Sequence, residues 1–268
     1  MIVIAHFIAI SCYVGATALA AMPFARRVRA PVRGVIALLA LGATAHGIAL
    51  LGMLQQLGSA SLTGLGPALS FAGFLLAIVL LLIEAITRDV SLALVAAPLA
   101  AVMTTVGNIS GLTPFMTLGG PRAVWLVTHI VLSFSGLAFY ATAAAAGAMY
   151  LVARRELKSG RFGAVYRFFP PLETLDRVNH FSAIAGFMGL TLGVILAGVY
   201  SIVYRTIAAP EMVWGLGAWL CIFVLAFGRI LRGWQAKRAA VISSVSFAGV
   251  VAFYVLIRAS SLGRGQFL

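Results

Sequence analysis

The chain has 268 residues, of which 62% are hydrophobic and only 9% are charged, and its mean hydropathy is +1.08. This composition excludes an ordinary soluble domain, because too few charged side chains are present to cover a water-facing surface. The net charge of +13 would suggest a nucleic-acid partner in a soluble protein. In a membrane protein it has another cause, since Lys and Arg gather in the short loops that stay in the cytoplasm. We therefore expect a membrane protein with no nucleic-acid partner.

Eight apolar segments are predicted to cross the bilayer, because about 20 apolar residues in a helix span its hydrocarbon core. No alternating strand pattern is present, and backbone groups in lipid must be hydrogen-bonded within the segment, so helices are expected rather than a barrel. The predicted fold is an all-α polytopic transmembrane bundle of eight helices, forming a single integral membrane domain over residues 1–268. The predicted spans are 2–22, 34–54, 68–87, 90–107, 124–152, 179–204, 212–230 and 239–257.

The basic residues predict how the spans are oriented. The apolar run begins at Ile2 with no cation before it, whereas Arg26 and Arg27 follow it. This order is opposite to that of a secretory signal and predicts a retained first span with its N-terminus outside. Most of the 19 Lys and Arg residues lie in or beside alternate connections. Both termini are therefore expected outside, with the segment Arg154–Arg177 in the cytoplasm.

The central cytoplasmic segment is the most basic part of the chain. Its cations are expected to rest on anionic headgroups or to dock a cytoplasmic partner. After Pro170 and Pro171, the acidic residues of Leu172–Arg177 predict a short helix that leads into the sixth span. The residues assigned to the partner or lipid surface are Arg154, Arg155, Lys158, Arg161 and Arg167.

Four histidines are the main candidates for chemistry, because ionisable groups within spans are expensive and commonly functional. Counting from the span ends places His6, His46 and His129 in the outer half of the membrane and His180 at the inner interface. His46 and His129 could bind one planar iron macrocycle from both faces, since neutral imidazole is a good ligand for haem iron. His6 is a weaker candidate. The alternative for each is a hydrogen bond to a carbonyl or hydroxyl of the next helix.

The remaining polar and small residues predict structure rather than catalysis. Glu84 lies four residues before Arg88, a spacing that favours an interfacial ion pair. Gly186, Gly189 and Gly193 share one face of the sixth span and predict a close helix contact. No catalytic set, phosphate loop or nucleophile motif is present, so we do not expect an enzyme.

Several short motifs, in this order and topology, resemble the cytochrome c assembly (CcsA/CcmC-type) superfamily. They are the span opening Thr128-His129-Ile130-Val131-Leu132-Ser133-Phe134, the run Leu172-Glu173-Thr174-Leu175-Asp176-Arg177 with Gly186-Phe187 and Leu190-Thr191-Leu192-Gly193 after it, and Val213-Trp214-Gly215-Leu216. The resemblance is continuous from about Trp125 to Tyr254. The smaller, eight-span HemX/YpjD-like branch is the most similar.

The resemblance implies haem handling at a bacterial cytoplasmic membrane, with haem b as the cofactor and cytochrome c maturation or haem-biosynthesis proteins as partners. His129 matches the outer-side haem histidine of the family, and His46 matches a histidine within a span. The tryptophan-rich WWD loop of haem-handling members is missing. Thr206–Glu211 stands in its place, with only Glu211 and Trp214 retained, which makes Trp214 a weak candidate for haem contact.

The leading hypothesis is a multi-pass membrane protein that binds or handles haem through His129, and through His46 as a second ligand. Two alternatives remain open. One is a cofactor-free scaffold or regulator whose basic cytoplasmic segment docks a partner, and the other is a small-molecule transporter.

Overall fold

A computed structural model describes residues 1–26, 28–57, 65–112, 120–160, 163, 168–205 and 209–262. This part of the chain forms helices and no strand, which confirms the predicted all-α class. The helices are α1 (Ile2–Arg26), α2 (Val32–Leu57), α3 (Leu65–Thr87), α4 (Ala93–Ile109), α5 (Gly120–Ser159), α7 (Leu172–Tyr204), α8 (Ala209–Ile230) and α9 (Ala236–Leu262).

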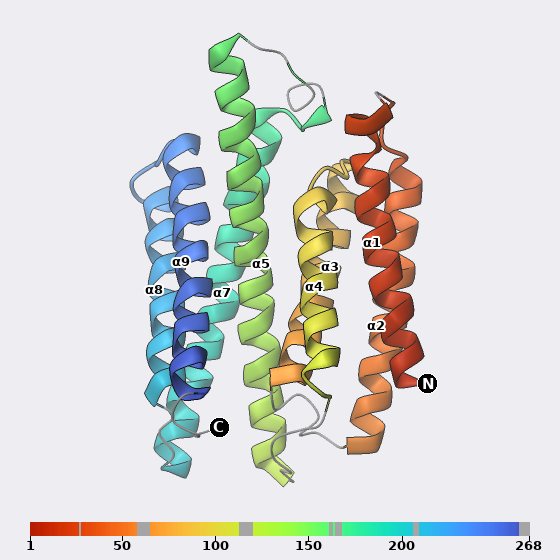
Figure 1. The fold of residues 1–268 in the computed structure, drawn as a ribbon. Helices are drawn as coiled ribbons and strands as arrows, with labels where there is room; N and C mark the ends of the chain where they lie inside the picture. Colours follow the sequence, from red (N-terminus) through yellow and green to blue (C-terminus); the bar gives the residue numbers. More distant parts are fainter. Residues whose placement is uncertain are drawn as a thin grey trace.

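Each helix corresponds to one of the eight predicted spans. Seven of them are long and apolar enough to cross a membrane, while α4 is an apolar helix of 17 residues. The described helices run up and down the bundle, and α1 begins at the same end at which α9 finishes (Figure 1). This arrangement is the one that an even number of spans requires.

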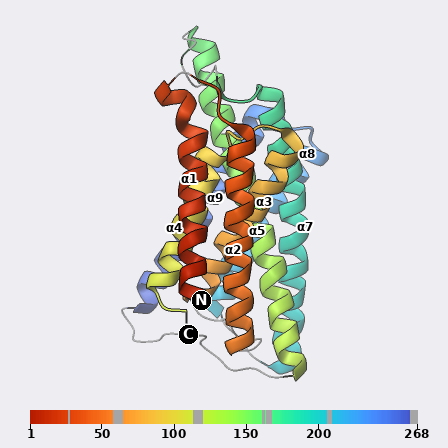
Figure 2. The ribbon, with the colours of Figure 1, turned by 90° about the vertical axis from the view of Figure 1, so that its right-hand side faces the viewer.

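The helices form two groups joined along α5. Helices α1 to α4 pack together at one side, and α7, α8 and α9 pack together at the other (Figure 1). Helix α5 packs against α7 and α9 and also against α3, so it connects the groups, as the perpendicular view shows (Figure 2). The first group contains His6 and His46, whereas His129 lies on the connecting helix.

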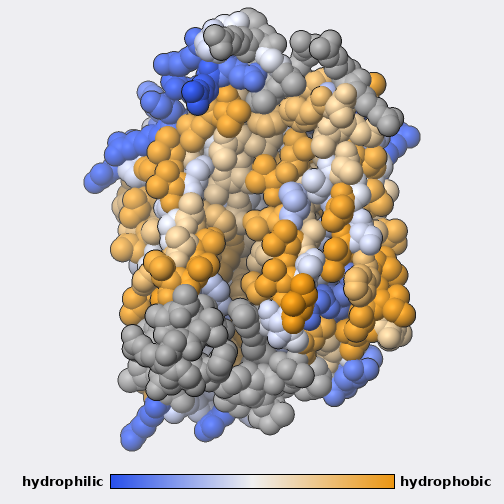
Figure 3. All heavy atoms as spheres, viewed as in Figure 1, coloured by the Kyte–Doolittle hydropathy of each residue, from blue (hydrophilic) through white to orange (hydrophobic). Residues whose placement is uncertain are grey.

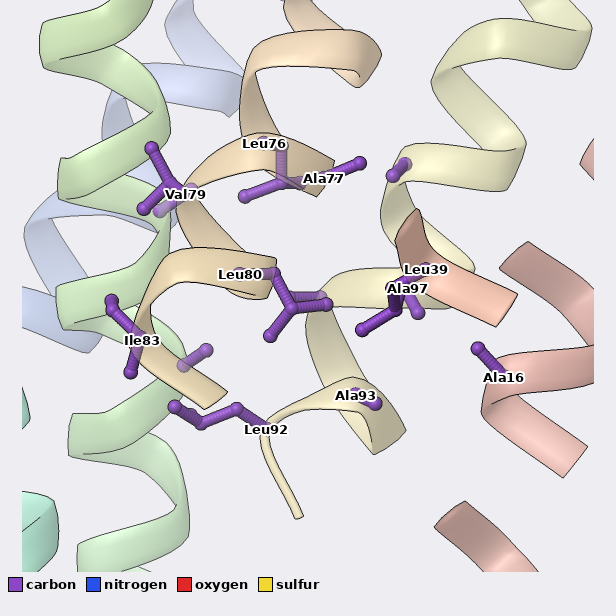
Figure 4. Close-up of a cluster of buried hydrophobic side chains, with 14 of the residues drawn as sticks. Ala16, Leu39, Leu76, Ala77, Val79, Leu80, Ile83, Leu92, Ala93 and Ala97 are labelled. Carbon is purple, nitrogen blue, oxygen red and sulfur yellow. The ribbon is translucent and has the colours of Figure 1, made fainter. Parts of the chain in front are cut away.

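Small and large apolar residues alternate in the core of the first group. Ala77 and Leu80 of α3 face Ala93 and Ala97 of α4, with Leu39 of α2 close by (Figure 4). Alanine allows the helix backbones to approach closely, which matters in lipid because packing rather than water exclusion drives helix association.

The outer surface of the bundle suits a bilayer. On the face shown in Figure 3, apolar side chains cover most of the middle, and hydrophilic residues gather towards the two ends. Large apolar side chains such as Ile86 and Ile202 are 79% and 78% exposed. In water such a surface would cause aggregation, whereas in a membrane it contacts acyl chains.

The connection between α3 and α4 is the tight hairpin expected from its length, but Glu84 does not form the predicted ion pair. Arg88 adopts a left-handed backbone conformation with φ 56°, and Glu84 is fully buried. Its Oε1 accepts a hydrogen bond of 2.8 Å from the backbone N–H of Ala93. The carboxyl group therefore caps the start of α4, where backbone N–H groups lack a partner within the helix.

Two boundaries around the basic segment also differ from the prediction. Helix α5 continues to Ser159, so Arg154, Arg155 and Lys158 lie on its last turns rather than in a loop. The short helix expected at 172–177 is continuous with the sixth span and forms the first turns of α7, which starts after Pro171. Amphipathic turns extend both helices beyond their apolar segments, and hydropathy alone does not detect such extensions.

Candidate functional site

Two of the candidate histidines meet in the first helical group. His6 of α1 and His46 of α2 are 1% and 0% exposed, and their ring centroids are 5.2 Å apart. The Nε2 atom of each ring lies 3.0 Å from the Oγ atom of Ser70 on α3. Tyr13, also fully buried, places its hydroxyl 3.2 Å from Nδ1 of His46. Three helices therefore contribute to one closed polar cluster.

The donors and acceptors in this cluster can be assigned, because the chemistry of each group allows only one arrangement of the hydrogen bonds. A backbone carbonyl can only accept, so Nδ1 of His6, 3.0 Å from the Ile2 oxygen, carries a proton. In neutral His6 the Nε2 atom then accepts from the Ser70 hydroxyl. Ser70 has no second proton, so Nε2 of His46 donates to it and Nδ1 of His46 accepts from Tyr13. All four ring nitrogens of His6 and His46 therefore have a hydrogen-bond partner.

Replacing Ser70 with alanine is expected to lower the free energy of unfolding by about 1.5 kcal/mol, because two buried imidazole nitrogens lose their partner. Unfolding of the detergent-solubilised chain with increasing SDS measures the change. Thr105→Ala is the matched control, because the Thr105 hydroxyl bonds only to the carbonyl of Ala101 in its own helix. Equal stability of the two variants would contradict the role given to Ser70.

His129 lies elsewhere, on the face of α5 that packs against α7. Its Nδ1 atom is 2.9 Å from the carbonyl oxygen of Gly193, and one turn earlier the indole N–H of Trp125 donates to the carbonyl of Leu196 at 3.1 Å. Because the Gly193 oxygen accepts, Nδ1 of His129 carries the proton and Nε2 has a free lone pair. No hydrogen-bond partner of Nε2 is present in the described part of the chain, and the side chain is only partly buried.

Glycines explain how α5 and α7 come close enough for this bond. A Cβ atom on Gly189 would lie 2.9 Å from the Cα atom of Gly136, and one on Gly136 would lie 2.6 Å from the backbone N of Leu190. Only residues without side chains permit this approach. The contact predicted for Gly186, Gly189 and Gly193 is confirmed, and its partner is the Gly136 face of α5.

The structure does not bring His46 and His129 to a shared site. His46 is hydrogen-bonded to α1 and α3, whereas His129 is hydrogen-bonded to α7. His6, the weaker candidate, is the actual neighbour of His46. A serine within an apolar span carries no sequence signal, so the pairing through Ser70 could not be predicted.

A second polar network, which the sequence analysis missed, joins helices at the opposite end of the bundle. Arg229 of α8, with a side chain only 7% exposed, forms an ion pair with Asp176 of α7. It also donates to Oδ1 of Asn179 at 3.0 Å. Asn179 in turn donates to the Ala143 carbonyl of α5 at 2.6 Å and to Ser243 of α9 at 2.8 Å. Four helices are fixed together here. Asn179, a polar residue near the start of the charge-free run that begins at Val178, was the available signal.

The other candidate residues, namely His180, Trp214 and the basic residues of α5, lie apart from both His129 and the His6–His46 cluster. His180 is partly exposed beside Asn179, and the indole N–H of Trp214 donates to the Val250 carbonyl of α9 at 3.0 Å, so its polar atom is occupied. Arg154, Arg155 and Lys158 line a cavity together with Lys237, which the prediction did not include. Arg161 and Arg167 lie outside the described residues.

No group of three or more His, Cys, Asp or Glu side chains that could hold a metal ion is present among the residues that the structure describes. A metal that brings its own macrocycle needs only one or two protein ligands. Of the three histidines that lie within the spans, His6, His46 and His129, only His129 has a ring nitrogen with no hydrogen-bond partner in the described structure.

Comparison with known proteins agrees with the resemblance. The chain is 32% identical to the cytochrome c biogenesis protein CcsA of Nostoc punctiforme over 96 residues, covering 35% of this chain and 27% of that protein. It is 27% identical to CcsA of Guillardia theta over 207 residues, covering 69% of this chain and 65% of the relative. The chain thus spans about a third or less of the length of the cyanobacterial relatives that it matches. No solved structure matches.

The broadest similarity is at the level of the family. The cytochrome c assembly protein family matches residues 62–263, which include α3 to α9 and all of the α5–α7 contact that holds His129. The relatives are named CcsA, and none of them supports the HemX/YpjD-like branch, which stays a prediction. On the extent of this match, the chain belongs to the cytochrome c assembly protein family.

Proposed function

We propose that this chain is a membrane protein of cytochrome c biogenesis that binds haem b through His129. Family membership and the names of the relatives support the biological role. The single observation that carries the ligand assignment is the hydrogen bond from Nδ1 of His129 to the Gly193 carbonyl. Such a bond fixes the tautomer and orientation of a metal-binding imidazole and leaves Nε2 as the ligand atom.

The donor chemistry fits the group. His129 would hold haem through Nε2, because a neutral, oriented imidazole with a free nitrogen is a good donor to iron, and the bound haem would supply the iron centre. His6 and His46 fit less well, because iron binding would require breaking a hydrogen bond to Ser70 or Tyr13. We therefore assign the protein ligand to His129 alone and give the pair a structural role.

The proposal also covers the location of the chain, its partners and its chemistry. The chain resides in a bacterial cytoplasmic membrane with both termini outside, which places His129 in the outer half and the basic end of α5 in the cytoplasm. Its partners are other proteins of cytochrome c maturation or haem biosynthesis. It binds and positions haem and makes no bond by itself; the side-chain hydroxyl of Ser133, beside His129, lies 3.4 Å from Nδ1 and not at Nε2.

Optical titration with haem tests the proposal. Purified protein in mild detergent is expected to give a Soret band that saturates at one haem per chain. His129→Gly should abolish the saturable band, and added imidazole should restore it, because the free base replaces the missing ligand. His180→Gly is the control, since His180 lies at the other membrane surface and should leave the band unchanged. A band that survives His129→Gly in full would refute the assignment.

A further inference from the structure

The basic end of α5 forms a cavity with the start of α9. Its volume is about 450 Å³, and its lining includes Arg154, Arg155 and Lys158 of α5 and Lys237 of α9. No acidic side chain is among the described residues that line it. Four cations around one hollow repel one another, so the arrangement favours a bound anion.

A second hollow follows the same seam between α5 and α9 deeper in the bundle. It has a volume of about 210 Å³, and Ala141, Ala145 and Ala148 of α5 form one wall, facing Leu99 of α4 and Phe247 of α9. Ser244 is the one hydroxyl in its lining, and that group already donates to the Ala144 carbonyl at 3.1 Å. The hollow therefore offers an apolar surface with no free polar group.

The separation of the two hollows along α5 is similar to the distance between the headgroup and the acyl chain of a lipid. On α5, Ala148 precedes Leu151 of the basic cavity by about one turn, and Ala141 lies roughly 20 Å below Arg154 at the helical rise. One leaflet of the hydrocarbon core is about 15 Å thick. Hydrophilic residues stand at the upper end of this face and apolar residues below them (Figure 3). A headgroup at the cations thus leaves its acyl chain at the level of the alanines.

We propose that the α5–α9 seam binds one anionic phospholipid of the inner leaflet. Its phosphate lies among Arg154, Arg155, Lys158 and Lys237, and one acyl chain lies along the alanine wall of α5. Basic cavities between transmembrane helices on the cytoplasmic side are suited to acidic headgroups. A soluble phosphate would use the cations but not the apolar hollow, and a zwitterionic lipid would use the hollow but gain little from four cations.

Native mass spectrometry of the full chain in detergent, with added cardiolipin, phosphatidylglycerol or phosphatidylcholine, tests this proposal. The wild-type chain is expected to bind both anionic lipids at least about 10-fold more tightly than phosphatidylcholine. In the variant R155Q/K237Q, anionic lipid binding should weaken by about 30-fold, from the loss of two cations near the membrane surface. Ala148→Leu fills the exposed edge of the apolar hollow. This variant should weaken the binding of long-chain phosphatidylglycerol but leave the binding of glycerol phosphate unchanged.

The control is R29Q/R33Q, which removes the same charge from the connection between α1 and α2 and from the first turn of α2, away from the seam. It should change lipid affinity by less than about 3-fold. An equal loss in both double variants, or equal affinity for all three lipids, would overturn the proposal. So would displacement of bound lipid by inorganic phosphate at equal affinity, or by haem. His129→Gly is expected to leave lipid binding intact, so failure of the haem assignment and failure of the lipid site are distinguishable.

Discussion

Replacing Asp176 with alanine is expected to lower the free energy of unfolding by about 3 kcal/mol. Arg229 is only 7% exposed, and without its carboxylate partner it becomes a buried charge with incomplete compensation. The loss should be cooperative, because Arg229 also holds Asn179, whose amide links α7 to α5 and α9. Unfolding by SDS in mixed micelles, followed by far-UV circular dichroism, measures the change.

The same helix provides a control for this prediction. Glu173 forms an ion pair of 2.9 Å with Arg177, but both side chains are largely exposed, at 82% and 76%. Glu173→Ala is expected to cost less than about 0.5 kcal/mol, as is usual for exposed pairs. If the two alanine variants are equally stable, the buried network does not hold the four helices together.

Replacing Gly189 with valine is the second change with a large expected effect. A Cβ atom there would lie 2.9 Å from Cα and 3.0 Å from N of Gly136, and backbone atoms of a packed helix cannot move aside as a flexible side chain can. Helices α5 and α7 must separate, at a cost of about 3 kcal/mol. The hydrogen bond between His129 and the Gly193 carbonyl should be lost as well, so the haem titration should lose its saturable Soret band.

Gly198, on the same helix, is the matched control for Gly189. No described atom lies within 4 Å of a Cβ placed on it, so Gly198→Ala should keep both the stability and the haem band, or gain a few tenths of a kcal/mol from helix propensity. Haem binding that survives Gly189→Val would show that the close contact is not what positions His129.

The helices were predictable from the sequence because span length and apolar composition are properties of each segment alone. The contact surface of α7 was also predictable from its own segment, because Gly186, Gly189 and Gly193 recur on one face of the helix. The choice of partner helix was not. Hydropathy places His6, His46 and His129 at a similar depth but contains nothing about which helices are neighbours, and the pair was therefore predicted as His46 with His129.

The errors at Glu84 and Arg229 have another origin. Both residues stand near span ends, where charged side chains normally reach water; Glu84 was assigned an interfacial ion pair, and Arg229 was given no role. In the structure Glu84 caps the next helix, and Arg229 is enclosed by the side chains of α7. A tight hairpin or a neighbouring helix can bury a terminal residue, and this burial depends on tertiary structure that local sequence does not encode.

The length of α5 links the two membrane surfaces mechanically. This uninterrupted helix of 40 residues has His129 near one end and Arg154 roughly 37 Å away near the other. Long helices bend only gently, so α5 acts as a lever: a tilt of about 5° pivoting at the imidazole shifts the guanidinium end by about 3 Å. A tilt of α5 at one membrane surface would therefore displace its residues at the other surface through a single rigid element, and the helices packed against α5 would have to follow.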